Sequence, residues 1–266
     1  MSASTLERPA TATPVVRAGI PTSRLVGVEL QKMFDTRSGF WLVTGGGIAS
    51  LVATIATILF APHSELGYGA FAGAIGAPLS VILPILGVLG VTSEWSQRTG
   101  LSTFTMVPHR ARVIGAKAAA VLTVGLGSIA LALAIGALGN VVGSTLVGVP
   151  IRWDIPVTQV LQIFLADGLG MLMGFTLGVL IRNSPGAIVG YFVYALVLPA
   201  ILGTLAGVQD WFAHAQGWID FQYSSTRLYD DGLTVTDWAH LGVSGLIWLV
   251  IPLAIGLRLL MRSEVK

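Results

Sequence analysis

One acidic residue stands apart because it lies deep within an apolar stretch. Asp167 occurs inside a run of mainly apolar residues from about 159 to 181. A charged side chain at the centre of a bilayer costs about 2.5 kcal/mol or more on insertion scales, so it usually faces other helices or water. Two roles are open for Asp167. It lies on a substrate path or at a seam between two chains, or it makes a buried hydrogen bond that fixes packing, in its protonated form if necessary.

Three glycines follow Asp167 at helical spacing. Gly170, Gly174 and Gly178 continue from it in steps of three and four residues, which places all four on one face of a helix. Small residues at this spacing allow another helix to approach closely. The pattern predicts a tight helix contact along this face.

A second group of polar residues lies between two apolar stretches, at positions 93–116. Glu94 and Arg98 are four residues apart, so on a helix they can pair with each other. The alternative is a solvated loop whose charges only anchor the two neighbouring helices at a membrane surface.

Signatures of catalysis, metal binding and nucleotide binding are absent from the sequence. There is no cysteine, which excludes disulfides, iron–sulfur clusters and cysteine-bound zinc. The four histidines are scattered, and none has the H-E-x-x-H spacing of a zinc site. The phosphate-binding pattern G-x-x-x-x-G-K-[ST] does not occur. The sequence therefore predicts no catalytic residues, no metal ligands and no cofactor bound by this chain.

The composition indicates a membrane protein. Of the 266 residues, 54% are hydrophobic and only 11% are charged, against about 25% charged in an ordinary globular domain. The mean hydropathy is +0.80. So few charges cannot cover the surface of a soluble protein, whereas lipid can cover an apolar one. Although the formal charge is +2, no basic stripe is interleaved with aromatic residues, so no nucleic-acid partner is expected.

The predicted fold class is an all-α integral membrane protein with six transmembrane helices. Each apolar stretch is long enough to span about 30 Å of hydrocarbon at about 1.5 Å per residue. The turn from Arg182 to Pro185 is the only separation between the fourth and fifth stretches, so they should form a tight helical hairpin. The stretches lie near 40–60, 70–92, 115–139, 159–181, 186–207 and 240–261, within a transmembrane domain at 40–262.

Three segments outside these spans are expected to have distinct roles. Residues 1–21 hold three prolines and no apolar run, which predicts a disordered cytoplasmic tail. Residues 22–39 predict an amphipathic helix in the membrane interface, with Met33 and Phe34 on its apolar face and Glu29 between apolar positions. Residues 208–239 are too long for a plain connector and rich in aromatics, so we expect them to fold onto the outer membrane face.

The distribution of basic residues predicts the orientation. With the N-terminus inside, 13 of the 15 Lys and Arg residues lie on inner segments, and only Arg152 and Arg227 lie outside. This asymmetry places both termini in the cytoplasm. Four tryptophans in the outer segments are typical of an interfacial aromatic belt, namely Trp153, Trp211, Trp218 and Trp238.

The loop at 93–116 resembles the signature loop of ABC-2-type transporter permeases. In that family an acidic residue, an Arg-Thr or Gly-Thr step, a Leu-x-Thr stretch, a proline, a basic residue and a later lysine recur in this order. The matching positions here are Glu94, Arg98, Thr99, Leu101, Thr103, Pro108, Arg110 and Lys117, with Gln97 and Phe104 in the same loop. The interfacial helix, the six spans, the inner termini and the long outer segment extend the resemblance to about residues 22–262. His109, between the proline and the basic residue, departs from the pattern.

The resemblance implies a type V exporter-like architecture and a set of partners. The loop would act as a coupling helix that docks on a separate ATP-binding subunit, which carries the ATP and Mg. In this role Glu94 and Arg98 would reach that subunit, and Leu101 and Phe104 would fill a hydrophobic groove on it. Two permease chains, identical or different, would enclose the export path, surrounded by membrane lipid. The expected function is export of a hydrophobic or amphipathic cargo, such as a drug, antimicrobial peptide or lipid-like molecule, across a bacterial inner membrane.

Other classes of membrane protein stay open. The main alternative is an ion-coupled secondary transporter or channel that uses Asp167. An intramembrane enzyme is disfavoured because the sequence offers no nucleophile–base pair or metal set. An ATPase-linked assembly that senses rather than transports is a further alternative.

Overall fold

The computed structural model of the protein describes residues 21–96, 110–230 and 232–262, and every element in these ranges is helical. Within them, six helices are long and apolar enough to cross a membrane, which confirms the all-α, multi-pass expectation. They are Arg37–Phe60, Tyr68–Ser93, Ala111–Val147, Val157–Ile181, Ser184–Val208 and Val235–Arg262.

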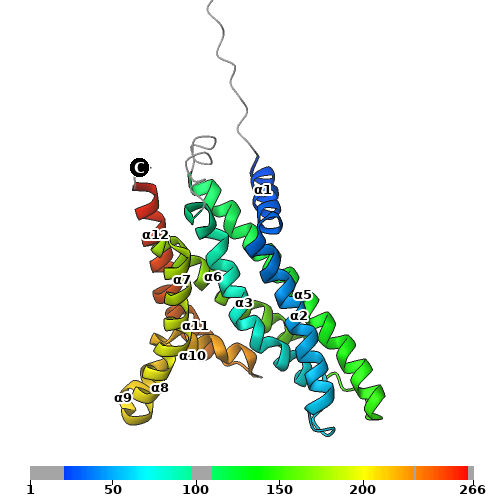
Figure 1. Cartoon of the computed structure of the whole chain (residues 1–266). Coiled ribbons are helices and arrows are strands. Elements are labelled where there is room, and N and C mark those ends of the chain that lie inside the picture. The colour runs from blue at the N-terminus through cyan, green and yellow to red at the C-terminus, as the bar shows by residue number, and fades with distance from the viewer. Residues whose placement is uncertain (1–20, 97–109, 231, 263–266) are drawn as a thin grey trace, which may run out of the picture.

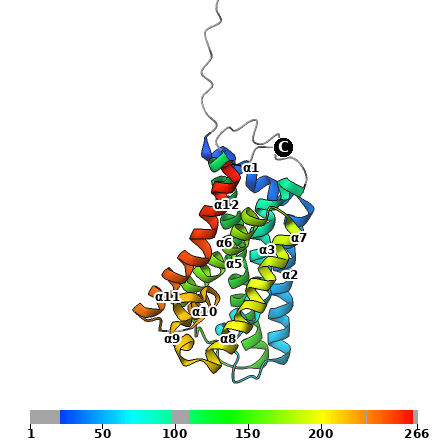
Figure 2. The same ribbon diagram turned by 90° about the vertical axis from the view of Figure 1, so that its left-hand side faces the viewer.

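Two central helices hold the bundle together. Helices α3 (Tyr68–Ser96) and α6 (Val157–Ile181) pack along each other. Helices α2 (Arg37–Phe60) and α5 (Arg110–Val147) cover α3 on one side, and the segments after α6 lie on the other (Figure 1). Figure 2 shows α1 (Thr22–Asp35) and the end of α12 (Ile251–Arg262) at one end, here called the terminal end. Helices α8 (Leu198–Val208) and α9 (Asp210–Ile219) lie at the opposite, distal end.

The third spanning helix is longer than the predicted 115–139. Helix α5 has 38 residues, which at about 1.5 Å per residue is about 57 Å and exceeds the hydrocarbon thickness. No proline interrupts its Ala- and Gly-rich sequence, and it ends before Gly148, which has a φ of 74°. Apolar count alone locates the hydrophobic part of a helix but not its ends.

The segment predicted as one interfacial helix at 22–39 divides at Thr36. The extended backbone of Thr36 ends α1, and its side chain accepts a hydrogen bond from the Gly39 amide at 3.3 Å to cap α2. Gly39 is required at this corner because a Cβ there would fall on the carbonyl oxygen of Met33. The corner turns the chain from α1 into the first span.

The buried face of α1 differs from the predicted apolar face. Phe34 is half exposed, whereas Glu29 is buried together with Met33. Glu29 is buried because it forms ion pairs with Lys117 of α5 at 2.6 Å and with Lys32 at 2.8 Å. Paired charges can be buried where an isolated charge cannot, so the ion pair fixes α1 on α5.

The fifth and sixth spans each contain a π-helical turn just before a proline. Segment η1 (Val193–Val197) connects α7 (Ser184–Phe192) to α8 (Leu198–Val208), and η3 (Leu246–Val250) connects α11 (Val235–Gly245) to α12. Pro199 and Pro252 lie two residues after these segments. A proline ring clashes with the carbonyl four residues earlier and offers no amide hydrogen, so the preceding turn widens.

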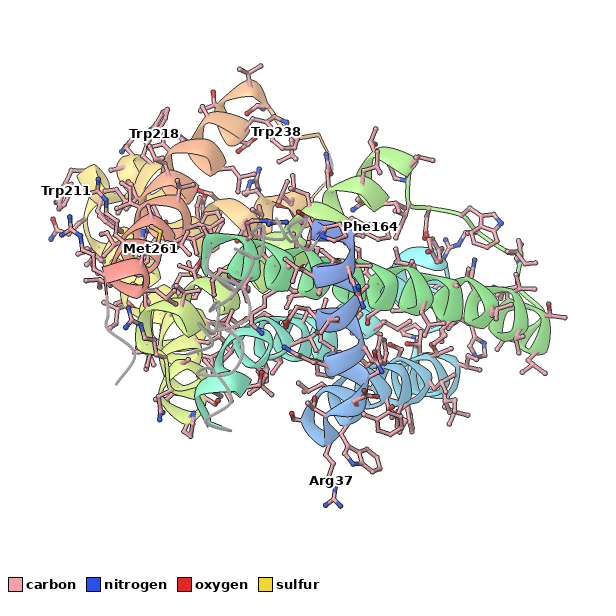
Figure 3. The ribbon with its side chains drawn as sticks, turned by 90° about the horizontal axis from the view of Figure 1, so that it is seen from above. Arg37, Phe164, Trp211, Trp218, Trp238 and Met261 are labelled. Atoms are coloured by element: carbon pink, nitrogen blue, oxygen red, sulfur yellow. The ribbon has the colours of Figure 1, made fainter. Side chains whose placement is uncertain are left out.

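The segment between these two spans folds into short helices. It contains α9 (Asp210–Ile219), α10 (Phe221–Thr226) and η2 (Arg227–Tyr229). Its aromatic residues divide between two environments: Phe212 and Phe221 are buried, whereas Trp211 and Trp218 are exposed. Figure 3 shows Trp211, Trp218 and Trp238 at the outer edge of the ribbon.

Candidate functional site

A cavity of about 710 Å³ lies in the distal half of the bundle. Its walls come from α3, α6 and the fifth span, and residues of α10 and η2 also line it. The segment between the fifth and sixth spans therefore borders a cavity formed by spanning helices.

The α3 wall is made of small residues at helical spacing. Gly69, Gly73, Gly76, Ala77 and Ser80 all line the cavity. A Cβ added at Gly73 or Gly76 would meet nothing within 4 Å. The space beside α3 is thus empty because the sequence places almost no side-chain volume there.

Asp167 lies on the α6 wall opposite. Its side chain is 5% exposed, and its Oδ1 accepts a hydrogen bond from the Tyr229 hydroxyl at 2.7 Å. The side-chain amide of Gln159 donates to the Tyr229 carbonyl at 2.9 Å, which ties η2 to α6. Burial raises the pKa of Tyr229 above its usual value, and the negative charge of Asp167 raises it further. The Tyr229 phenol therefore stays protonated and acts as a donor to Asp167.

Two tyrosines of the fifth span complete the wall. Tyr191 donates to the Ser80 carbonyl at 3.0 Å, which ties α7 to α3. Tyr194, within the π turn, has its ring centroid 6.4 Å from that of Tyr191 and 5.8 Å from that of Trp248. Phe221 of α10 is 2% exposed and also lines the cavity. The site thus combines one buried carboxyl group with aromatic rings.

The glycines that follow Asp167 pack against α3 of the same chain. A Cβ at Gly174 would fall on the carbonyl oxygen of Pro84, and a Cβ at Gly178 would lie 3.1 Å from that of Val88. A Cβ at Gly170 would lie 3.6 Å from the Pro84 ring. The contact is reciprocal, because a Cβ at Gly87 of α3 would fall on the carbonyl oxygen of Met171. On the side of the cavity toward the terminal end, α3 and α6 therefore cross backbone against backbone.

The predicted coupling loop is described only at its edges. Glu94 lies in the last turn of α3, and Arg110 is the first residue of α5. Thr92, just before the loop, accepts a hydrogen bond from Ser184 at 2.8 Å, which joins this end of α3 to the start of α7. The remaining residues assigned to the loop lie outside the described residues, and their role stays a prediction: Gln97, Arg98, Thr99, Leu101, Thr103, Phe104 and Pro108.

Sequence reasoning identified Asp167 but not its surroundings. Tyr229 lies 62 residues further along the chain, in a short 3-10 segment with no periodic pattern. The small residues from Gly69 to Ser80 recur at helical spacing, but the sequence alone does not show that they line a cavity. Across the described ranges, no three His, Cys, Asp or Glu residues are grouped to hold a metal ion.

A comparison with protein-family models finds no match to this chain. No curated protein matches it either.

Proposed function

We propose that this chain is the membrane-spanning permease subunit of an ATP-driven exporter, with ATP hydrolysed by a separate subunit. The observation that carries the transport role is the cavity of about 710 Å³ between spanning helices. Its volume falls within the range of about 300–1,000 Å³ typical of small-molecule sites. A hydrophobic or amphipathic cargo fits a cavity with aromatic walls.

The role of ATP rests on the resemblance of the loop at 93–116 to the coupling loop of ABC-2-type permeases. The fold offers a mechanical route for such coupling. Helix α3 is a single helix from Tyr68 at the cavity to Ser96 at the loop, and it forms the small-residue wall. A displacement of the loop by the ATP-binding subunit would move α3 and change the shape of the cavity.

A second permease chain has a free surface available on the fifth span. Helix α8 has no buried residue. Ala200, Gly203 and Gly207 are exposed on it, and a Cβ at either glycine would meet nothing within 4 Å. The glycine face of α6 is covered by α3, so we place the contact between two chains at α8.

The orientation follows from the sorting of basic residues predicted from the sequence. Both termini and the coupling loop lie in the cytoplasm of a bacterium, and the cavity lies toward the outer face of its inner membrane. The two basic residues of the outer segments both bind other groups of the same chain. Arg152 donates to the carbonyls of Ser64 and Leu66, and Arg227 pairs with Asp230 at 2.8 Å.

Co-purification in detergent tests the role of an ATP-binding subunit. Candidate ATP-binding subunits encoded beside the gene should bind the wild-type chain, and the complex should hydrolyse ATP. Glu94→Ala and Arg98→Ala should weaken or uncouple the complex, whereas Glu65→Ala, an exposed acid in a distal loop, should not. If no ATPase binds a folded chain, or if Glu65→Ala acts like the loop variants, the assignment is wrong.

An ion-coupled transporter or channel is the second candidate function. The observation that favours it is the burial of Asp167 beside the cavity, because acidic residues within spans often carry ions or protons. In proteoliposomes that contain the permease alone, an ion gradient would then drive transport without ATP. In that case Asp167→Asn would abolish transport, whereas the loop variants Glu94→Ala and Arg98→Ala would still transport.

A further inference from the structure

We infer that the cavity binds a lipophilic organic monocation, with Asp167 as the counter-ion and aromatic side chains around it. Only the identification of this cation as the transported cargo rests on the proposed function. Binding itself depends on the cavity alone.

The charges around the cavity have one sign. Among the described residues that line it, the charged ones are Asp154 and Asp167, and none is basic. The nearby Arg152 is engaged with the carbonyls of Ser64 and Leu66. In a site of low dielectric constant an unbalanced carboxylate strongly favours a cation over a neutral or anionic ligand. The cavity is therefore selective by charge.

Asp167 retains unused hydrogen-bonding capacity. A carboxylate has about four acceptor positions on its two oxygens. Across residues 21–96, 110–230 and 232–262, the bond from Tyr229 to Oδ1 is the hydrogen bond made to this side chain. A buried carboxylate with one donor is far from satisfied. Because the side chain lines the cavity, a ligand cation can supply the missing interaction.

The aromatic lining suits a cation with bulky apolar groups. Tyr191, Tyr194, Tyr229 and Phe221 line the same cavity as Asp167. Aromatic rings attract cations through their quadrupole, most strongly where water is excluded. The empty space beside Gly73 and Gly76 on the opposite wall leaves room for apolar substituents. A small hydrated ion would make few of these contacts, whereas a lipophilic cation makes all of them.

A binding assay with two probes of the same shape and opposite charge tests the inference. The full chain is purified in detergent without nucleotide or ATPase. Radiolabelled tetraphenylphosphonium is the cation, and tetraphenylborate, measured in separate samples, is the anion. We expect saturable binding of the phosphonium and no saturable binding of the borate.

Variants of Asp167 locate the site. Asp167→Asn keeps the shape and the acceptor for Tyr229 but removes the charge, so it should weaken phosphonium binding by about tenfold or more. Asp167→Glu keeps the charge and should retain measurable binding, which would assign the loss in the Asn variant to the missing charge, provided that the Asn variant elutes from size-exclusion chromatography as wild type does. Asp210→Asn removes an exposed acid of α9 outside the cavity lining and should bind as wild type does.

Three outcomes would overturn the inference. They are saturable borate binding as tight as that of the phosphonium, unchanged phosphonium binding in Asp167→Asn, or the same loss in Asp210→Asn. The proposed function fails separately, since a chain that binds the cation but recruits no ATPase keeps the site and loses the exporter role. A chain that couples to an ATPase but binds no cation loses only the site.

Discussion

The crossing of α3 and α6 predicts that one added methyl group at Gly174 destabilises the protein. A Cβ at this position would fall on the carbonyl oxygen of Pro84, against an ordinary contact of 3.4–4 Å. Overpacking costs about 1–3 kcal/mol where side chains can adjust. Here the obstacle is backbone, so we take the upper end, about 3 kcal/mol. Alanine returns about 1 kcal/mol as the better helix former, which leaves a net loss of about 2 kcal/mol for Gly174→Ala.

Gly168→Ala is the matched control for this substitution. Gly168 lies on the same helix, and a Cβ there would meet nothing within 4 Å. The propensity gain alone should then stabilise the variant by up to about 1 kcal/mol. The assay is thermal unfolding of the purified chain in detergent, followed by loss of the monodisperse peak in size-exclusion chromatography. With about 2–4 °C per kcal/mol for a chain of this size, Gly174→Ala should unfold about 4–8 °C below wild type.

A double substitution tests whether the crossing itself is responsible. Gly87→Ala places a Cβ on the carbonyl oxygen of Met171, across the same contact. Once α3 and α6 have separated to admit one methyl group, the second costs less, so the double variant should lose less than the sum of the two single losses. If Gly174→Ala unfolds at the temperature of wild type or of Gly168→Ala, the close packing of the two helices is refuted.

Three further substitutions test other contacts. Glu29→Gln removes one carboxylate charge from the 2%-exposed Lys117, with which Glu29 pairs at 2.6 Å, and should cost about 1.5–3 kcal/mol, as for a hydrogen bond to a charged group. The same thermal assay measures this loss, and a loss no larger than that of a surface variant would contradict it. Tyr229→Phe removes the bond to Asp167 and should cost about 1–3 kcal/mol at neutral pH. The pKa of Tyr229 is raised in the folded protein, so wild type should also lose stability as pH rises above about 10, where the phenol of the unfolded chain ionises. Tyr229→Phe should lose less stability over that pH range. Parallel curves of stability against pH for the two proteins would refute the assignment. Gly76→Leu projects into open space, so it should leave the unfolding temperature within a few degrees of wild type but block phosphonium binding; unchanged binding would place the ligand elsewhere.

The spanning helices were predictable because lipid imposes simple rules on sequence. An apolar run near Phe40 and a four-residue turn after Ile181 are enough to locate a first span and a hairpin. The structure shows the reason at the hairpin, where Arg182 has a left-handed φ of 56° and Asn183 caps the next helix. Such local signals act within a few residues and can be read directly from the chain.

The site was predictable only in part because its contacts are long range. Asp167 was found since an acid in an apolar span is conspicuous, but its partner Tyr229 lies in another element and follows no pattern. Glu29 was placed among polar positions of an amphipathic helix, yet it is buried because Lys117 approaches from 88 residues away. Pairing across such distances depends on how helices pack, which periodicity within one helix does not encode.

The ion pair between Glu29 and Lys117 also sets an order of events during synthesis. The two residues are 88 positions apart, which at about 5–20 residues per second is about 4–18 s of translation. During that interval Glu29 has its neighbour Lys32 but not Lys117, and α1 has no third span to dock on. The first two spans are therefore made before α1 can pack on α5, although α1 can already contact α2.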